Sequence, residues 1–185
     1  MNSPIIIVLA SGRGERFRAS GGTGDKLQAK LLHQAVLEHT LEAVRGSGLP
    51  WHLEENGLPG MGDSIAAAVG ATSQAAGWLI LPADLPLVRS QTLLAVASAL
   101  GRCPVVIPLY QGRRGHPVGF SASCRQELLA LRGDGGAAVV ARSRSPFQLT
   151  LSDIGCVTDI DTVDDLRRAE RLMSERVHAA QSPTR

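Results

Sequence analysis

The sequence is poor in aromatic residues and in net charge, and each shortage excludes a class of function. Only 3% of its 185 residues are Phe, Trp or Tyr, which argues against the stacking surfaces that bind single-stranded nucleic acid. The 19 Lys and Arg residues nearly balance the 17 Asp and Glu residues, which leaves a net charge of +2. A protein that binds nucleic acid or an anionic membrane over a broad surface is usually far more basic. We therefore expect no nucleic-acid and no membrane partner.

Cysteine and long apolar runs are also scarce. Cys103, Cys124 and Cys156 are far apart and contain no CxxC pair, which predicts neither a disulfide framework nor a zinc knuckle and favours a reducing compartment. The apolar run at residues 5–10 is much shorter than the ~20 residues that span a bilayer. The N-terminal MNSP lacks the pattern of a signal peptide. These features predict a cytoplasmic protein.

The chain alternates short apolar runs with segments of helical periodicity. Strands are predicted where apolar residues follow one another, at residues 5–10, 78–81, 104–109, 148–151 and 157–160. The main helices are predicted at residues 36–46, 65–76, 90–100 and 163–177, with shorter ones after residues 123 and 136. This alternation predicts an α/β fold, a single Rossmann-like three-layer αβα sandwich with a mostly parallel twisted sheet. We expect the domain to cover residues 1–178, followed by a disordered tail at 179–185.

The remaining segments are predicted from turn and capping residues. Residues 11–26 are expected to form a long loop, residues 51–53 a short link and residues 110–120 a hairpin. Ser90 is expected to cap the helix that begins there. Ser123 with Gln126, and Thr162 with Asp165, have the spacing of a capping box.

The first apolar run ends in the sequence LASGRGERFRASGGTGDK at residues 9–26, which fits neither of two common phosphate loops. The dinucleotide-binding pattern GxGxxG fails because Phe17 stands at the third glycine. The P-loop pattern fails because Asp25 separates Gly24 from Lys26. A strand followed by glycines and basic residues nevertheless indicates that an anion binds here.

The loop contains the groups that hold a polyphosphate. Gly12 and Gly14 allow close approach of backbone N–H donors, and Arg13, Arg16 and Lys26 add cationic donors. A solvated polar loop with incidental charges is the alternative. Polar loops also follow the strands that end near residues 82 and 160. Because α/β folds bind ligands beyond the carboxyl ends of their strands, the three loops predict one active site.

Seven segments, in order, resemble the motifs of nucleotidyltransferases of the GlmU-like and molybdenum-cofactor type. They are LASGRGERF, KLQAKLLHQAVLEHTL, GMGDSIAAAV, LILPADLPLV, RRGHPVGF, GDGGAAVV and DIDTVDDL, and they cover roughly residues 5–170. The chain is most similar to the MobA-like cytidylyltransferases of molybdenum cofactor biosynthesis, which join molybdopterin to CTP and release pyrophosphate. The resemblance implies a GT-A-like fold, a nucleoside triphosphate and a phosphorylated pterin as substrates, and a molybdoenzyme that receives the cofactor.

The chain departs from the motifs of this family in three places. The insert RASGGTGD lengthens the loop between Arg16 and Lys26, and we expect it to be mobile without nucleotide. Lys30 replaces a proline, and residues 33–35 (HQA) replace a GxP motif. Between the first long helix and GMGDS only a short segment remains where the family has a strand, a helix and a strand. The sheet is therefore expected to have lost one element.

Chemistry and resemblance together identify candidate site residues. Nucleotidyl transfer requires charge neutralisation, so Lys26, Arg16 and Asp84 are predicted to be catalytic. Asp84 at a strand end and, by resemblance, Asp161 would hold Mg²⁺, which prefers oxygen ligands. The predicted acceptor contacts are His116 and Asp134, and Asp134 is the reserve metal ligand. The predicted nucleotide-binding residues are Leu9, Ala10, Ser11, Gly12, Arg13, Gly14, Arg16, Lys26, Gly62, Asp63 and Ser64. The structural alternatives are a turn or cap for Asp84, a turn for Asp134, helix caps for Asp161, Asp63 and Ser64, and a core histidine for His116.

The predicted reaction is Mg²⁺-dependent transfer of CMP from CTP to molybdopterin. Ser11 in LASG stands at the third position, where the loop of cytidylyltransferases (LAAG) has alanine and that of guanylyltransferases (LAGG) has glycine, and its small side chain with a Cβ resembles the cytidylyltransferase type. The alternatives are guanylyl transfer to molybdopterin, transfer to a sugar phosphate or phospholactate, and a non-catalytic chaperone that binds the cofactor. A dinucleotide-binding oxidoreductase is the third class, and Phe17 counts against it.

Overall fold

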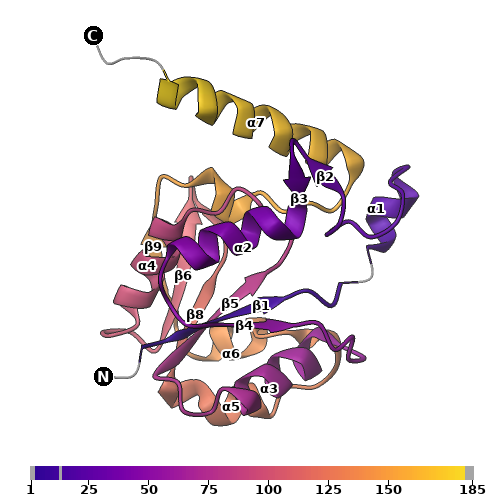
Figure 1. Cartoon of the computed structure of the whole chain (residues 1–185). Coiled ribbons are helices and arrows are strands. Elements are labelled where there is room, and N and C mark those ends of the chain that lie inside the picture. Colours follow the sequence, from indigo (N-terminus) through magenta and orange to yellow (C-terminus); the bar gives the residue numbers. More distant parts are fainter. Residues whose placement is uncertain (1–2, 13, 182–185) are drawn as a thin grey trace.

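The computed structural model describes residues 3–12 and 14–181 (Figure 1). Its main sheet has seven strands in the order β4-β1-β5-β8-β6-β7, with β9 paired to β6, and β2 and β3 form a separate hairpin. The strands are β1 Ile5–Leu9, β2 Lys30–Leu31, β3 Gln34–Ala35, β4 Trp51–Glu54, β5 Gly77–Pro82, β6 Val105–Tyr110, β7 Arg113–Arg114, β8 Val118–Ser121 and β9 Phe147–Thr150. The α-helices are α1 Glu15–Ala19, α2 Val36–Gly46, α3 Met61–Ala71, α4 Ser90–Ala99, α5 Arg125–Leu129, α6 Ala138–Ser143 and α7 Val163–Gln181. Three 3₁₀ helices are η1 Ala122–Cys124, η2 Gly133–Gly135 and η3 Ile154–Val157.

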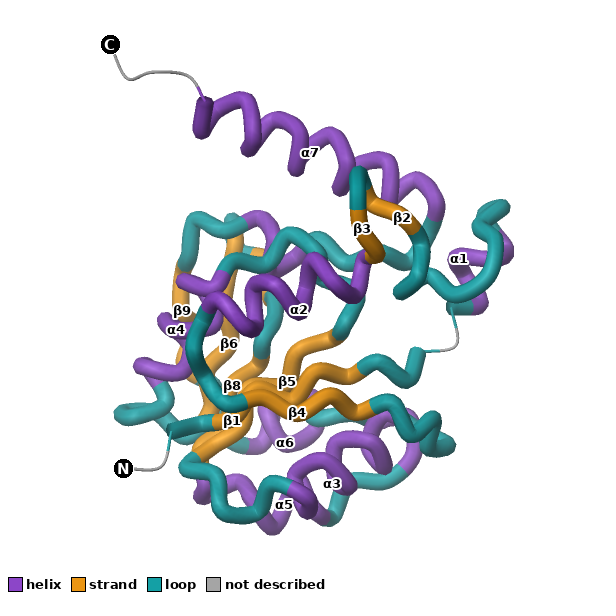
Figure 2. The backbone as a smooth tube through the Cα atoms, in the orientation of Figure 1, coloured by secondary structure: helices purple, strands orange, loops and turns teal. Residues whose placement is uncertain are grey.

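The sheet is mostly parallel and lies between two layers of helices. β4, β1 and β5 are parallel neighbours, and β6 runs in the same direction because β8 is antiparallel to both β5 and β6. β9 is parallel to β6. Helices α2, α4 and α7 lie on one side of the sheet and α3, α5 and α6 on the other (Figures 1 and 2). The predicted three-layer α/β sandwich is confirmed.

Strand β1 shows why an unbroken apolar run predicted the centre of the sheet. Ile6 and Val8 point into the core cluster that contains residues of α2 and α4. Ile7 and Leu9 point into the opposite cluster, with residues of α3, α5 and α6. Successive side chains of a strand point to opposite faces, so a strand covered on both faces needs apolar residues at every position.

Two predictions about the sheet were wrong. Residues 51–53, predicted as a link, belong to β4, which pairs in parallel with β1 at the edge of the sheet. Residues 157–160, predicted as a strand, form the end of η3 and an irregular segment. There the Asp153 carboxylate accepts a hydrogen bond from Gly155 N, which turns the chain into η3, and Ile160 N donates to Asp84 O at 3.0 Å. Val157 and Ile160 are buried without joining the strand pairing.

The capping predictions had mixed outcomes. Thr162 and Asp165 form the predicted reciprocal cap, in which Thr162 N donates to Asp165 Oδ2 at 2.8 Å and Asp165 N donates to Thr162 Oγ1 at 3.2 Å. Ser90 is the first residue of α4 but does not cap it, because its hydroxyl donates to a carbonyl of α2 at 2.8 Å. Ser123 does not cap α5, since its hydroxyl bonds to that of Ser121. Neither serine caps its helix, because the hydroxyl of each forms a hydrogen bond to a group outside that helix.

Several helix limits also differ from the predictions. The predicted loop at 11–26 contains the short helix α1, and α3 spans Met61–Ala71 instead of residues 65–76. Helix α7 continues through Gln181, beyond the expected domain end at 178, and residues 182–185 of the expected tail lie outside the described residues. No helix in the described part of the chain is long and apolar enough to cross a membrane.

Candidate active site

A cavity of about 770 Å³ lies at the carboxyl ends of the parallel strands. Its walls come from the loops after β1 and β5, the start of α3, the hairpin from β6 to β8 and the segment between η3 and α7. The loops predicted to converge on one site therefore do so. Of the predicted site residues, those that line the cavity are Leu9, Ser11, Gly12, Gly14, Arg16, Lys26, Asp84, His116, Asp134 and Asp161.

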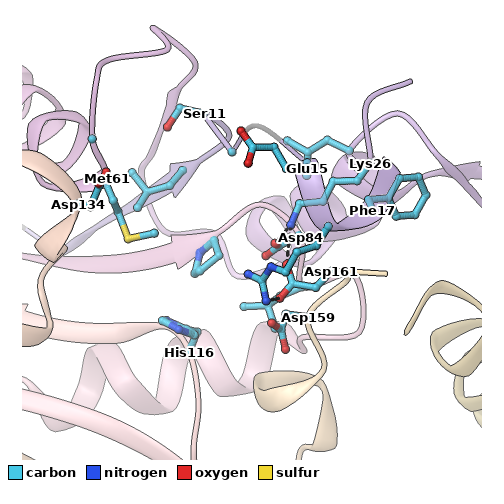
Figure 3. A pocket seen from close by; sticks show the side chains of 18 of the residues that line it. Ser11, Glu15, Phe17, Lys26, Met61, Asp84, His116, Asp134, Asp159 and Asp161 are labelled. Carbon is cyan, nitrogen blue, oxygen red and sulfur yellow. Dashed lines mark hydrogen bonds and ion pairs between the residues drawn. The ribbon is translucent and has the colours of Figure 1, made fainter. Parts of the chain in front are cut away.

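The charged centre of the cavity is a cluster of two basic and two acidic side chains, of which Figure 3 labels Lys26, Asp84 and Asp161. Lys26 Nζ lies 2.6 Å from Asp84 Oδ2 and 3.1 Å from Asp161 Oδ1. Arg16 Nη1 lies 2.8 Å from Asp161 Oδ2. Three segments far apart in sequence thus meet at one point. The capping alternative for Asp161 is wrong, because Asp165 supplies the cap of α7 and the Asp161 carboxylate binds Lys26 and Arg16.

Lys26 is a buried cation held by its acidic neighbours. Only 8% of the residue is exposed. Burial by itself would lower the pKa of Lys26, but the charges and hydrogen bonds of Asp84 and Asp161 outweigh it and raise the pKa above its usual value. Lys26 therefore stays protonated at neutral pH and neutralises negative charge at the centre of the cavity.

The acidic side of the cluster has the donors that a divalent metal needs. Asp84 Oδ1 is buried and has no hydrogen-bond partner among the described residues. Such an oxygen is costly unless a cation or donor meets it. Mg²⁺ is commonly held by one or two carboxylates together with substrate phosphates. Within residues 3–12 and 14–181 no group of three or more His, Cys, Asp and Glu could hold a metal alone. Asp84 and Asp161 fit a metal that arrives with a phosphate ligand.

Asp63 and Ser64, near the start of α3, do not line the cavity but form hydrogen bonds to neighbouring segments. Ser64 is fully buried, and its hydroxyl lies 3.2 Å from that of Ser11 in the glycine loop. Asp63 Oδ2 accepts a hydrogen bond from Gly133 N at 2.9 Å. The N-cap of α3 is Gly60 and has no side-chain hydrogen bond, so the capping alternative is wrong for both residues.

The other predicted nucleotide contacts have different positions. Ala10 is outside the cavity lining, and its N–H donates to Glu54 O on β4. Gly62 packs against the chain before η2, where a Cβ would lie 2.9 Å from Arg132 O. Arg13 lies outside the described residues. Close backbone packing therefore accounts for the glycine at position 62.

Comparison with known proteins places this chain in a family. The MobA-like NTP transferase domain matches residues 42–149, more than half of the chain. The chain belongs to this family. A curated relative, the bifunctional protein GlmU of Xanthomonas oryzae pv. oryzae (strain MAFF 311018), is 28% identical over 142 residues, which cover 65% of this chain and 30% of that protein. The chain thus spans less than a third of that relative. The purine catabolism protein PucB of Bacillus subtilis (strain 168) is 28% identical over 165 residues, 80% of each chain.

Solved structures show the same fold. Rv0371c of Mycobacterium tuberculosis H37Rv superposes with a TM-score of 0.78 at 23% identity, over 92% of this chain and 98% of that one. A second structure of Rv0371c is a complex with manganese. The molybdopterin-guanine dinucleotide biosynthesis protein A of Archaeoglobus fulgidus superposes with a TM-score of 0.63 at 18% identity, over 92% and 99% of the two chains. The predicted nucleotidyltransferase type of fold is therefore confirmed.

Several residues that line the cavity were not predicted from the sequence. Asp159, Arg113 and Arg114 line it but were not predicted as site residues. Partial burial raises the pKa of Asp159, and the negative charges of Asp84 and other neighbouring aspartates act in the same direction. The sequence contained features that could have indicated these residues. The motif DIDT contains Asp159 beside Asp161, and Arg113 and Arg114 directly precede GHP. The sequence did not show which of these side chains would face the cavity.

His116 and Cys156 form an uncharged part of the wall. His116 Nδ1 is buried and has no hydrogen-bond partner in the part of the chain that the structure describes. Burial lowers the pKa of His116 despite the nearby charges of Asp84 and Asp159, so the imidazole is neutral at pH 7. Burial, together with the charge of Asp153, raises the pKa of Cys156 to about 11. A thiol that stays protonated is not a nucleophile. The predicted contact of His116 with the acceptor stays a prediction.

The insert before Lys26 is attached to the start of α7. Ser20 Oγ accepts a hydrogen bond from Val163 N at 2.9 Å, and Arg16 at the start of α1 binds Asp161. Gly22 N donates to Phe17 O and closes the turn after α1. These contacts connect the insert to the segment that carries Asp161. The mobility of the insert without nucleotide stays a prediction.

Proposed function

We propose that this MobA-like domain is a metal-dependent nucleotidyltransferase that transfers CMP from CTP to molybdopterin and releases pyrophosphate. The observation that carries the proposal is the buried ammonium of Lys26 between Asp84 and Asp161, beside a glycine loop and in a cavity of about 770 Å³. A cavity of this size suits a nucleotide, and the cluster combines cationic phosphate ligands with carboxylate metal ligands. A molybdoenzyme that receives the finished cofactor is the expected partner.

In this reaction an oxygen of the acceptor phosphate attacks the α-phosphorus of the triphosphate. Most of the catalysis then comes from position and charge neutralisation. Lys26 and Arg16 would bind the triphosphate and stabilise the charge that develops on the leaving pyrophosphate. Gly14, at φ 61°, allows the backbone to turn toward the phosphates. Asp84 and Asp161 would hold Mg²⁺ or Mn²⁺, which neutralises phosphate charge when bound.

The base and the acceptor are supported by separate observations. Ser11 at the third position of LASG favours CTP, and its hydrogen bond to Ser64 fixes the side chain beside the cavity. The family, and the name of the Archaeoglobus protein with the same fold, favour a pterin acceptor. That name also makes guanylyl transfer the second candidate. A comparison of nucleotides therefore decides between the two.

The test measures pyrophosphate release with molybdopterin and CTP, GTP or ATP, in Mg²⁺ and separately in Mn²⁺. We expect release with CTP to be fastest and to depend on the metal. Fastest release with GTP would replace the cytidylyl assignment by the guanylyl one. No release with any nucleotide in either metal would overturn transfer to this acceptor, and sugar phosphates and phospholactate assayed in parallel would show whether another acceptor is used.

Lys26 is expected to compete with the metal for the two carboxylates. In the Lys26→Met variant a positive charge about 3 Å from both acidic groups is removed, so binding of Mn²⁺ without nucleotide should strengthen by roughly tenfold, while turnover falls. Free Mn²⁺ is measured by electron paramagnetic resonance during a titration. Lys30→Met, at an exposed lysine outside the cavity, is the matched control. Weaker or unchanged Mn²⁺ binding in Lys26→Met would contradict the competition.

A further inference from the structure

The strand order places basic residues on opposite sides of Asp84. Arg16 and Lys26 follow β1, on one side of β5 and its terminal aspartate. β8 and then β6 lie on the other side of β5, and β7 continues from the carboxyl end of β6. β7 consists of Arg113 and Arg114, which both line the same cavity. The cavity therefore has two pairs of basic residues. Arg16 and Lys26 lie on the triphosphate side of Asp84, and Arg113 and Arg114 lie on the opposite side.

The two groups differ in their partners. Arg16 and Lys26 are already bound to carboxylates. Arg113 and Arg114 are both exposed, and neither forms an ion pair within residues 3–12 and 14–181. Arg113 Nη2 donates to Val157 O at 3.3 Å, while the side chain of Arg114 makes no hydrogen bond to the described residues. Since a guanidinium has five N–H donors, most of their donors are available to an anion.

The β7 segment is held in place by its backbone. The two residues of the turn between β6 and β7 have φ values of 49° and 78°, the geometry of a tight two-residue hairpin. Gly115 N donates to Pro108 O at 2.8 Å, and His116 N donates to Cys156 O at 2.8 Å. A Cβ on Gly115 would overlap Cys156, so the segment packs directly against η3. The backbone that carries the two arginines is therefore fixed at the wall of the cavity.

We propose that Arg113 and Arg114 form the subsite for the phosphate monoester of the acceptor. Guanidinium groups bind phosphate through paired N–H···O hydrogen bonds and keep their charge at any physiological pH. A phosphate held there meets Asp84 from the side opposite Arg16 and Lys26. Because neither arginine is paired with a carboxylate of the described residues, both can bind an external anion. His116, which lines the same cavity, is available to the rest of the acceptor.

This inference rests on the proposed function, because the acceptor phosphate is the nucleophile of that reaction. One of its oxygens forms a bond to the α-phosphorus, while the bond from the α-phosphorus to the bridging oxygen breaks. Pyrophosphate leaves with that electron pair. A dianionic monoester already has its nucleophilic electron pair, so no proton is transferred. Two arginines that position the phosphate without protonating it suit this step.

The experiment titrates inorganic phosphate into the protein saturated with Mg²⁺ and a non-hydrolysable α,β-methylene analogue of CTP, followed by ³¹P NMR and calorimetry. The Arg113→Gln/Arg114→Gln variant is expected to bind phosphate at least tenfold more weakly, with its affinity for the analogue changed less than twofold. Arg114→Gln alone, which removes no side-chain hydrogen bond within the described residues, should lower phosphate affinity without a change in thermal unfolding. The matched control is Arg102→Gln, at an exposed arginine outside the cavity.

The outcomes separate the subsite from the function. The subsite would be overturned if phosphate affinity were unchanged in both β7 variants, or if Arg102→Gln lowered it equally. Binding of the CTP analogue in the same experiment would still support the proposed function. Loss of phosphate binding in the β7 variants without any analogue binding by the wild-type protein would support the anion subsite and overturn the nucleotide function. With an active acceptor, the β7 variants are expected to raise the KM for the acceptor and leave the KM for CTP unchanged.

Discussion

Replacing Asp84 by asparagine is expected to lower nucleotidyl transfer by about 10²–10³-fold, which corresponds to about 2.7–4 kcal/mol of transition-state stabilisation. Asparagine keeps the size of the side chain but removes the charge that lies 2.6 Å from Lys26 Nζ. It also replaces Oδ1, the buried oxygen with no partner among the described residues, or turns an amide toward the cation site. The loss should appear in kcat more than in the KM for the acceptor. Steady-state pyrophosphate release measures both.

The control for this prediction is Asp164→Asn. Asp164 has a side chain that is 88% exposed in an i,i+3 pair with Arg167, so its replacement should change neither turnover nor unfolding. The Asp84→Asn protein should retain its fold, because Asp161 still binds Lys26. Near wild-type turnover in Asp84→Asn would show that the metal and the triphosphate are held by other groups.

Replacing Asp153 by alanine is expected to destabilise the fold by about 3–5 kcal/mol, the usual cost of removing one partner of a buried ion pair. The Asp153 side chain is 5% exposed and accepts hydrogen bonds from Arg89 N, Thr92 Oγ1 and Gly155 N at 3.0, 2.7 and 3.0 Å. It also pairs with Arg176 Nη2 at 3.2 Å. Burial lowers the pKa of Arg176 and Asp153 opposes that shift, so alanine would leave a partly buried guanidinium without its counter-charge.

Urea denaturation and thermal unfolding test the Asp153 prediction. For a chain of this length 3–5 kcal/mol corresponds to a decrease in Tm of roughly 6–20 °C. Asp164→Ala, on α7 but exposed, is the control and should unfold like the wild type. Since Asp153 joins α4, η3 and α7, turnover at a temperature where the variant is folded should also fall, because η3 leads to Asp161. An unchanged denaturation midpoint in Asp153→Ala would contradict this central role.

Local sequence patterns determined the frame of the site. The unbroken apolar runs at 5–10 and 78–81 predicted β1 and β5, because strands buried on both faces need apolar side chains at every position. Parallel strands bring their carboxyl ends to one edge, so the loops that carry Lys26, Asp84 and Asp161 were predicted to converge. The capping box of Thr162 and Asp165 was predictable because both partners lie within one helical turn.

Only the tertiary structure decided the contacts whose partners are far apart in sequence. Trp51–Glu54 forms a strand because it can pair with the free edge of β1. Ser90 does not cap α4, because its hydroxyl donates a hydrogen bond to a backbone carbonyl of α2. No local pattern predicted the contacts of Asp153 with three other segments, or showed that the arginines before GHP would line the cavity. The sequence by itself therefore determined the class of fold and the family resemblance, and it predicted that the loops carrying Lys26, Asp84 and Asp161 converge. The packing of distant segments decided which other side chains line the cavity, because a side chain's direction depends on which neighbours bury or bind it.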